Sequence, residues 1–311
     1  MWRRLTVPGI FLFLAVDVFL VLLALRHTEG RPAPAGDAAS ATALPAAETP
    51  TSVPTAGPTI RASRVPASPA PRVVTAPVRF LTVAGDTVLR APRGSCAGRR
   101  TVAVTVSGDR GATFASRRVT GLAEVLDVEA APGSGLALVG LDRRCRPGRW
   151  TSRDGGVSWL RGPDPNGGWH LSADAGAASV ASPVGPRRTP CSVRAVSAIG
   201  TGVLRVLCSD GGLLGTPDVG ATWITLGRLA GAVDIRFTTP GDGVALAAQP
   251  GCPAAVLDTV DGGTTWSRLA CLPGRAPRAV ATAGDVVAAQ VGRELYVSTD
   301  GGTTWPGAGG G

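Results

Sequence analysis

The chain has 311 residues, and its composition favours many short strands joined by turns over a helical protein: glycine (43) and proline (26) are abundant, and aromatic residues make up 5%. Arginine supplies all of the side-chain positive charge, and a net charge of +9 would suit a nucleic acid, an anionic lipid or an acidic partner. The arginines occur singly or in pairs without a longer run, which argues against nucleic-acid binding.

An apolar segment at residues 5–25 contains one charge, Asp17, near its middle. As a helix it would be about 30 Å long, enough to cross a bilayer. We expect residues 1–30 to hold a cytoplasmic N-terminus and an uncleaved transmembrane signal anchor; the alternative is a cleaved signal peptide, whose apolar region is normally shorter. Arg3 and Arg4 precede the segment, so the positive-inside tendency places the rest of the chain outside the cytoplasm.

Residues 31–71 are rich in proline, alanine and threonine and contain no aromatic residue. Such a segment cannot bury enough apolar surface to offset the entropy lost on ordering. We therefore expect a disordered tether that separates the membrane from a globular domain at residues 72–311.

An eight-residue pattern, S/T-x-D-x-G-x-T/S-W/F, occurs five times in this domain. A carboxylate and a hydroxyl can accept the backbone N–H groups of a turn, and glycine adopts the positive φ that other residues resist. The pattern therefore predicts five similar turns, each covered by the aromatic residue that follows. The aspartates are Asp109, Asp154, Asp218, Asp261 and Asp300, and the aromatic residues are Phe114, Trp159, Trp223, Trp266 and Trp305.

This motif resembles the Asp box of bacterial neuraminidase repeats, which is found in sialidases, sortilin-type receptors and the photosystem II assembly-factor family. The resemblance implies a β-propeller in which each box joins the third and fourth strands of a blade. The bias toward arginine, alanine and glycine indicates a GC-rich genome, so we expect an actinobacterial, membrane-anchored member.

The spacing of the motifs predicts an all-β propeller of about six four-stranded blades, within a range of five to seven. Motifs begin at residues 107, 152, 216, 259 and 298, close to one blade apart except for the second gap. That gap contains alternating segments at 168–173 and 178–182, which favour a blade without a motif over a long insertion in a five-bladed ring.

Strands are expected at residues 233–237, 243–248, 254–259 and 265–269 in one unit, and at 278–283, 285–290 and 294–298 in the last unit. After its motif the last unit has only a poor outer strand, at residues 304–305, and the segment around residues 72–75 could supply that strand and protect the open edge.

Six cysteines in an exported domain indicate three disulfides. Two pairs are centred on predicted hairpin turns and should face each other across them, and the remaining two precede the third strands of consecutive units, so they should join adjacent blades. The expected pairs are Cys191–Cys208, Cys252–Cys271 and Cys96–Cys145. Without a C-x-x-C pair and with only two histidines, the chain is not expected to hold a metal or another cofactor.

The sialidase resemblance implies an arginine triad, a tyrosine nucleophile assisted by glutamate, an acidic aspartate and an Arg-Ile-Pro motif. The chain has one tyrosine, Tyr296, which strand packing explains, and no Arg-Ile-Pro. The glutamates after the tether are Glu124, Glu129 and Glu294, and His170 has no evident catalytic partner. We expect no catalytic site.

The predicted function is that of a scaffold in the cell envelope, with one transmembrane helix and an extracytoplasmic propeller that binds an envelope or membrane protein, since loops on a rigid frame commonly carry binding sites. The alternative is a carbohydrate-active enzyme, a sialidase-like glycosidase or lyase, on the same frame. The shortage of tyrosine, glutamate and histidine argues against it.

Overall fold

The computed structural model describes residues 77–306 except for residues 99, 132, 134, 164–167, 175 and 176. These residues belong to one structural unit, Ala70–Gly311. The predicted membrane span with Asp17, the tether and the segment around residues 72–75 lie outside the described residues. Within the described residues, no helix is long and apolar enough to cross a membrane.

The described residues form six antiparallel sheets, four with four strands and two with three. We number these sheets as blades 1 to 6 in chain order. Blade 1 contains β1 (Phe80–Ala84), β2 (Thr87–Ala91), β3 (Ala103–Ser107) and β4 (Ala115–Arg118); blade 2 contains β5 (Leu122–Ala131), β6 (Gly135–Asp142), β7 (Pro147–Ser152) and β8 (Leu160–Gly162); blade 3 contains β9 (His170–Leu171), β10 (Ser179–Ser182) and β11 (Gly185–Arg188). Blade 4 contains β12 (Val193–Ala198), β13 (Leu204–Cys208), β14 (Gly212–Thr216) and β15 (Ile224–Arg228); blade 5 contains β16 (Ala232–Phe237), β17 (Gly243–Gln249), β18 (Cys252–Thr259) and β19 (Ser267–Cys271); blade 6 contains β20 (Pro277–Ala283), β21 (Val286–Val291) and β22 (Glu294–Ser298).

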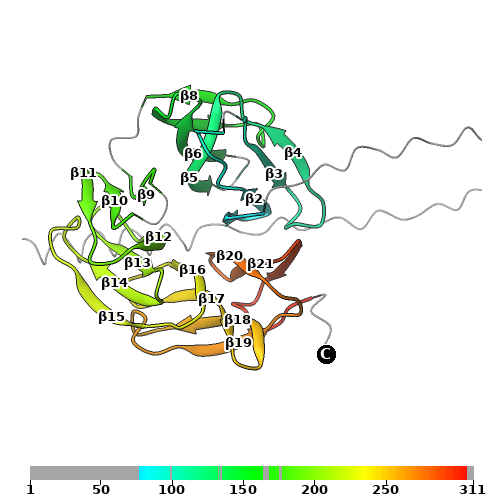
Figure 1. Cartoon of the computed structure of the whole chain (residues 1–311). Coiled ribbons are helices and arrows are strands. Elements are labelled where there is room, and N and C mark those ends of the chain that lie inside the picture. Colours follow the sequence, from blue (N-terminus) through cyan, green and yellow to red (C-terminus); the bar gives the residue numbers. More distant parts are fainter. Residues whose placement is uncertain are drawn as a thin grey trace, which may run out of the picture. The chain divides into compact units, whose positions relative to one another are not determined.

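The blades form a closed ring, a six-bladed β-propeller (Figure 1). The innermost strands β1, β5, β9, β12, β16 and β20 contact one another in that order, and β20 also contacts β1. The last contact closes the ring through apolar packing of Leu81 and Val83 from blade 1 with Ala279 and Ala281 from blade 6. The prediction of an all-β propeller of about six blades is confirmed.

Blade 3 is the predicted blade without a motif, and it fills the longer gap between the second and third motifs. The sequence indicated two of its strands but not β11, whose residues Gly185–Arg188 carry no buried apolar side chain. Within the described residues blade 6 contains only β20, β21 and β22, and residues 304–305, expected to begin its outer strand, are not part of a strand. The other predicted strands agree within about two residues.

One strand boundary was wrong for a physical reason: β19 begins at Ser267 rather than at Thr265. Thr265 remains in the turn because its N–H donates to Asp261 Oδ1 at 2.9 Å and its hydroxyl donates to Oδ2 at 2.7 Å. Thr259 completes the turn, since its hydroxyl donates to Asp261 Oδ1 at 2.8 Å and accepts the N–H of Gly263 at 2.9 Å.

The same four hydrogen bonds recur in all five copies of the motif, around Asp109, Asp154, Asp218, Asp261 and Asp300. We call these five hairpins the motif turns. Each aspartate therefore acts within its own turn, and no two of them form a shared site through these bonds.

The motif glycine has a second role that the sequence did not reveal. Gly263 has φ +96°, and a Cβ atom there would lie 2.1 Å from Leu213 of blade 4. In the same way, Gly302 contacts Leu269 of the preceding blade, and Gly111 of blade 1 contacts Leu295 of blade 6. The glycine thus lets each motif turn press against the neighbouring blade, including across the ring closure.

All three predicted disulfides are present. Cys191–Cys208 and Cys252–Cys271 each lie within one blade, and Cys96–Cys145 joins the loops before β3 and β7 in adjacent blades. Cys191–Cys208 and Cys252–Cys271 close short loops, with sequence separations of 17 and 19. In the chain-entropy model each of these two bonds adds about 3 kcal/mol to the free energy of unfolding.

We predict that replacing both Asp261 and Asp300 by alanine lowers the melting temperature, because each change leaves a turn N–H and two hydroxyls without their acceptor. Differential scanning calorimetry of the purified chain measures the effect. Asp285→Ala is the matched control, since it removes an exposed aspartate from a nearby hairpin. An unchanged melting curve for the double variant would contradict the assigned role of these carboxylates.

Acid should destabilise the domain through the same groups. Hydrogen bonds from the Thr265 backbone N–H, then from the hydroxyls of Thr265 and Thr259, lower the pKa of Asp261 to about 2, and similar bonds lower the pKa of Asp300 to about 2. In the unfolded chain these groups titrate near pH 4 (about 3.9), so the unfolded state takes up protons first as the pH falls. The stabilisation is complete above about pH 4 and is lost between about pH 4 and pH 2. Melting temperatures across this range should fall less steeply for Asp261→Asn combined with Asp300→Asn than for the native chain.

The backbone of the motif turns gives a paired test of strain. Gly262 has φ +75°, and Val219 occupies the equivalent position of another motif turn with φ +59°. A β-branched residue in this region costs about 1–3 kcal/mol, so Gly262→Val should lower the free energy of unfolding by that amount. Val219→Gly should raise it by less, because glycine also adds entropy to the unfolded chain. Denaturant titration measures the free energy of unfolding of both variants. A Gly262→Val variant as stable as the native chain would contradict the backbone strain assigned to this position.

Candidate binding site in the central channel

The inner strands surround a channel that opens as a wide funnel at one end. This hollow has a volume of about 900 Å³. Its walls come from the ends of β1, β5, β12, β16 and β20 and from Trp169, which precedes β9. Trp169 is anchored by a hydrogen bond from its indole N–H to the carbonyl of Thr201 at 3.1 Å. The funnel is therefore lined by all six blades.

Two carboxylates from β5 and one guanidinium from β16 line the funnel: Asp127, Glu129 and Arg236. Removal from bulk water raises the pKa of Asp127 to about 7, although the charge of Arg236 opposes this rise and Glu129 adds to it. Glu129 forms an ion pair with Arg149 of β7. Asp127 therefore titrates near neutral pH.

Charged side chains close the channel below the funnel. Arg79, which precedes β1, reaches across the channel, and its guanidinium donates to the carbonyls of Val233 (3.3 Å) and Arg194. Asp234 accepts the N–H of Val280 at 3.0 Å, and Arg236 donates to the carbonyl of Val196 at 2.8 Å. Only a small void of about 10 Å³ remains among these groups. The funnel is consequently a blind hollow.

A second hollow, of about 570 Å³, opens at the other end of the channel. We call it the basic mouth, because Arg79, Arg93, Arg194 and Arg278 line it. Pro77, the first residue that the structure describes, also lines it.

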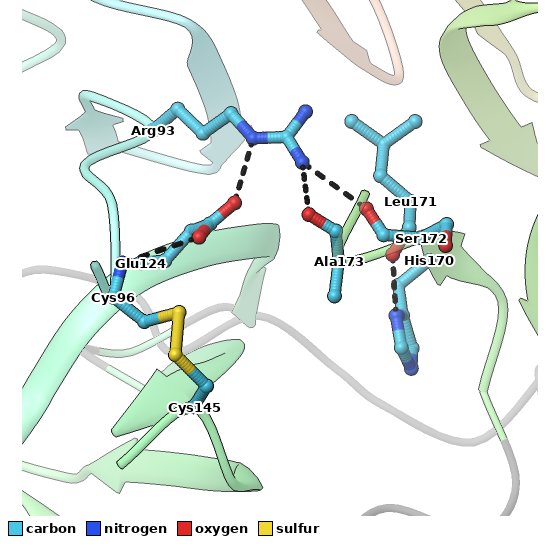
Figure 2. A network of polar contacts seen from close by, with 8 residues as sticks. All are labelled: Arg93, Cys96, Glu124, Cys145, His170, Leu171, Ser172 and Ala173. Carbon is cyan, nitrogen blue, oxygen red and sulfur yellow. Dashed lines mark hydrogen bonds and ion pairs between the residues drawn. A yellow bond between two sulfur atoms is a disulfide. The ribbon is translucent and has the colours of Figure 1, made fainter. Parts of the chain in front are cut away.

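Figure 2 shows how Arg93 fixes the wall of the basic mouth. Its Nε donates to Glu124 of β5 at 2.9 Å, and its Nη2 donates to the carbonyls of Ser172 (3.1 Å) and Ala173 (3.2 Å), which follow β9. Glu124 also accepts the N–H of Cys96 at 3.3 Å, next to the disulfide with Cys145. Arg93 is half-buried, and it thereby connects blade 1 to blade 2 through the ion pair and to blade 3 through the two carbonyls.

The two ends of the propeller carry different surfaces. We call the side with the motif turns and the wide funnel the motif face. It also holds the first hairpins of the blades, since Gly262 N–H donates to the carbonyl of Gly241, and Gly301 N–H to that of Asp285, both at 2.8 Å. Five large apolar side chains are exposed in the described part of the chain. Val157, Leu160, Ile224 and Val260 lie in or beside motif turns, and Val184 lies in the β10–β11 turn, next to β11, whose Arg187 contacts the motif turn of blade 4.

The structure does not bring the residues compared with sialidases together. Tyr296 lies on β22, where its hydroxyl donates to the carbonyl of Pro273 at 3.2 Å, and it lines neither hollow. Glu124 forms an ion pair with Arg93, and Glu129 lies in the funnel. His170 is buried in β9, with Nδ1 2.9 Å from the carbonyl of Leu171. Among the described residues, no group of histidine, cysteine or acidic side chains has metal-site geometry.

Sequence reasoning missed Asp127 and Arg79 as channel residues. Asp127 stands in a mostly apolar strand that also carries Glu124 and Glu129, and charged residues inside an innermost strand are a signal that could have pointed to the channel. Nothing in the sequence places Arg79 across the channel, because its partners lie in blades 4 and 5.

No protein-family model matches the sequence, and no curated protein is significantly similar to it. Solved structures similar to the chain include YCF48 from Cyanidioschyzon merolae, at 12% identity and a TM-score of 0.41 over 70% of this chain and 80% of that one. YCF48 bound to a D1 peptide gives 15% and 0.45, over 71% and 78%. The GH74 xyloglucanase from Xanthomonas campestris gives 21% and 0.32 over 73% of this chain, which spans only 38% of the enzyme. Similarities this low say nothing about the activity or the partners of this chain.

Proposed function

We propose that the chain is a membrane-anchored, extracytoplasmic β-propeller that binds a protein of the envelope or membrane at its motif face and acts as a scaffold. The observation that carries this proposal is the combination of the wide funnel with exposed apolar side chains around it. Leu160 is 74% exposed and Val260 is 77% exposed.

Exposed apolar residues grouped at one face support a protein partner. Protein interfaces have an apolar centre surrounded by a polar rim, and a few buried side chains supply most of the binding energy. At the motif face the turn aspartates supply polar groups beside Val157, Leu160 and Val260. A partner that covers these side chains and inserts a segment into the funnel would bury both features together.

The extracytoplasmic location rests on the three disulfides and on the apolar segment at residues 5–25. Disulfides persist in oxidising compartments and are rare in the cytosol. All six cysteines are paired in the structure. A span ahead of the propeller would hold this domain at the outer side of the membrane.

The test is proximity labelling of the full chain in its native envelope, with a labelling enzyme fused after Gly311 and a membrane-impermeant reagent. We expect the native chain to label a defined envelope protein. With Leu160→Asp combined with Val260→Asp, labelling of that protein should decrease about tenfold or more. Ser116→Asp combined with Thr120→Asp, which adds the same charge at exposed positions of β4 and the loop after it without removing an apolar side chain, should retain it.

Labelling that the apolar variant leaves unchanged would contradict binding at the motif face. Labelling of the same proteins by residues 1–76 alone would assign the contact to the anchor and tether. Absence of any label with the impermeant reagent, while a permeant reagent works, would place the propeller in the cytoplasm.

The carboxylate pair in the funnel favours a glycosidase as the second candidate function. Most glycosidases use two carboxyl groups, one of which stays protonated near neutral pH, and the raised pKa of Asp127 beside Glu129 meets that requirement. If the funnel is catalytic, the native chain should release reducing ends from a bacterial envelope glycan, and Asp127→Asn should abolish release while leaving the melting temperature unchanged. Equal activity in both proteins, or none in either, would reject this candidate.

A further inference from the structure

Charge is divided between the two faces of the propeller. The motif face carries eight exposed aspartates, Asp86, Asp109, Asp154, Asp218, Asp242, Asp261, Asp285 and Asp300. The opposite side, which we call the basic face, consists of the basic mouth and the loops that join second to third strands and one blade to the next. Its loops carry six exposed arginines, Arg100, Arg143, Arg144, Arg146, Arg275 and Arg293.

The acidic residues of the basic face are fewer, and several are already paired. Asp142 forms ion pairs with Arg146 and Arg161, and Asp210 pairs with Arg228. Glu124 is paired with Arg93, while Asp174 and Glu294 are exposed. The face therefore retains an excess of positive charge around the mouth.

The guanidinium groups of the basic mouth are positioned in advance. Backbone carbonyls hold Arg79 and Arg194, the latter through Ala232 at 3.4 Å, so neither bond neutralises the charge. The Nε atom of Arg278 is buried and has no hydrogen-bond partner among the described residues. Guanidinium groups fixed in this way suit oxygen anions such as phosphate, which accept several N–H groups at once.

We propose that the basic face docks on the phosphate headgroups of an anionic phospholipid membrane, with the motif face turned away from the bilayer. None of the exposed large apolar side chains of the described residues belongs to this face, so it lacks the anchors of a typical protein interface. Many basic side chains on one surface are attracted to anionic lipid without inserting into the acyl chains. The part of the chain that contains the proposed anchor leads into the domain at Pro77, on this same face.

This inference rests on the proposed anchor, because a tethered domain meets the membrane repeatedly at high local concentration. It also gives the scaffold an orientation: the wide funnel and the apolar side chains around it would face a partner in the envelope, and the arginines would face the lipid.

The experiment uses the full chain in nanodiscs of phosphatidylcholine alone or of phosphatidylcholine mixed equally with phosphatidylglycerol. Hydrogen–deuterium exchange is measured for the loops at residues 143–146 and 273–278 and, as internal reference, for the motif turn at 259–266. We expect the two basic loops to exchange about tenfold more slowly in the anionic discs than in the neutral discs, with no change at the motif turn. High salt should remove the difference.

The variant Arg143→Glu combined with Arg144→Glu should lose this protection. Arg118→Glu combined with Arg268→Glu, which makes the same change of charge on the outer strands β4 and β19, should keep it. Protection that is equal in both discs, absent in both, or found at the motif turn would overturn the proposal, as would protection that an acidic polypeptide or DNA produces without anionic lipid. Retention of the chain in neutral discs reports separately on the anchor, so loss of docking and loss of the anchor are distinguishable.

Discussion

The paired contact of a carboxylate with two hydroxyls at the motif turn is the interaction on which the rest of the propeller depends. In blade 5, Asp261 binds the hydroxyls of Thr259 and Thr265, and this geometry forces positive φ at the next two glycines. The turn then brings Gly263 against Leu213 of the neighbouring blade. The local hydrogen bonds of the turn thereby set how closely adjacent blades pack.

The aromatic residue of the motif also holds the motif glycine in place. Trp266 donates its indole N–H to the carbonyl of Gly263 at 3.0 Å and packs with Phe237 of the same blade, ring centroids 6.0 Å apart. The same indole bond is made by Trp159 and Trp305. The apolar core is divided into several clusters, one of which runs through blades 1 to 4, and others lie between later blades and across the ring closure. Blade 3 has no motif, and the Arg93–Glu124 ion pair and the indole of Trp169 fasten its inner end instead.

The channel follows from the geometry of the ring. Six innermost strands leave a central space that alanine and valine side chains do not fill, and charged residues occupy it. Arg79 donates to backbone carbonyls, and Arg236 forms an ion pair with Asp234 and also donates to a carbonyl, so the channel is divided into a wide funnel and a basic mouth. The two openings differ in charge and in apolar exposure, and this difference is the basis for assigning a protein partner to one face and a lipid surface to the other.

The sequence by itself determined the features that depend on nearby residues. The repeated motif predicted the turns, because each turn is closed by side chains within six residues of one another. The resemblance of the motif to the Asp box implied the propeller, and the spacing of the motifs favoured a blade without a motif in the second gap. The disulfides could also be predicted, since Cys252 and Cys271 lie symmetrically about one turn and Cys96 and Cys145 recur at one place in consecutive units. Only the tertiary structure decided which residues meet in the channel and which charges share a face. Asp127, Arg79 and Arg278 come from blades 2, 1 and 6, and their environment arises only when the ring closes, because closure sets both their distances and their removal from water.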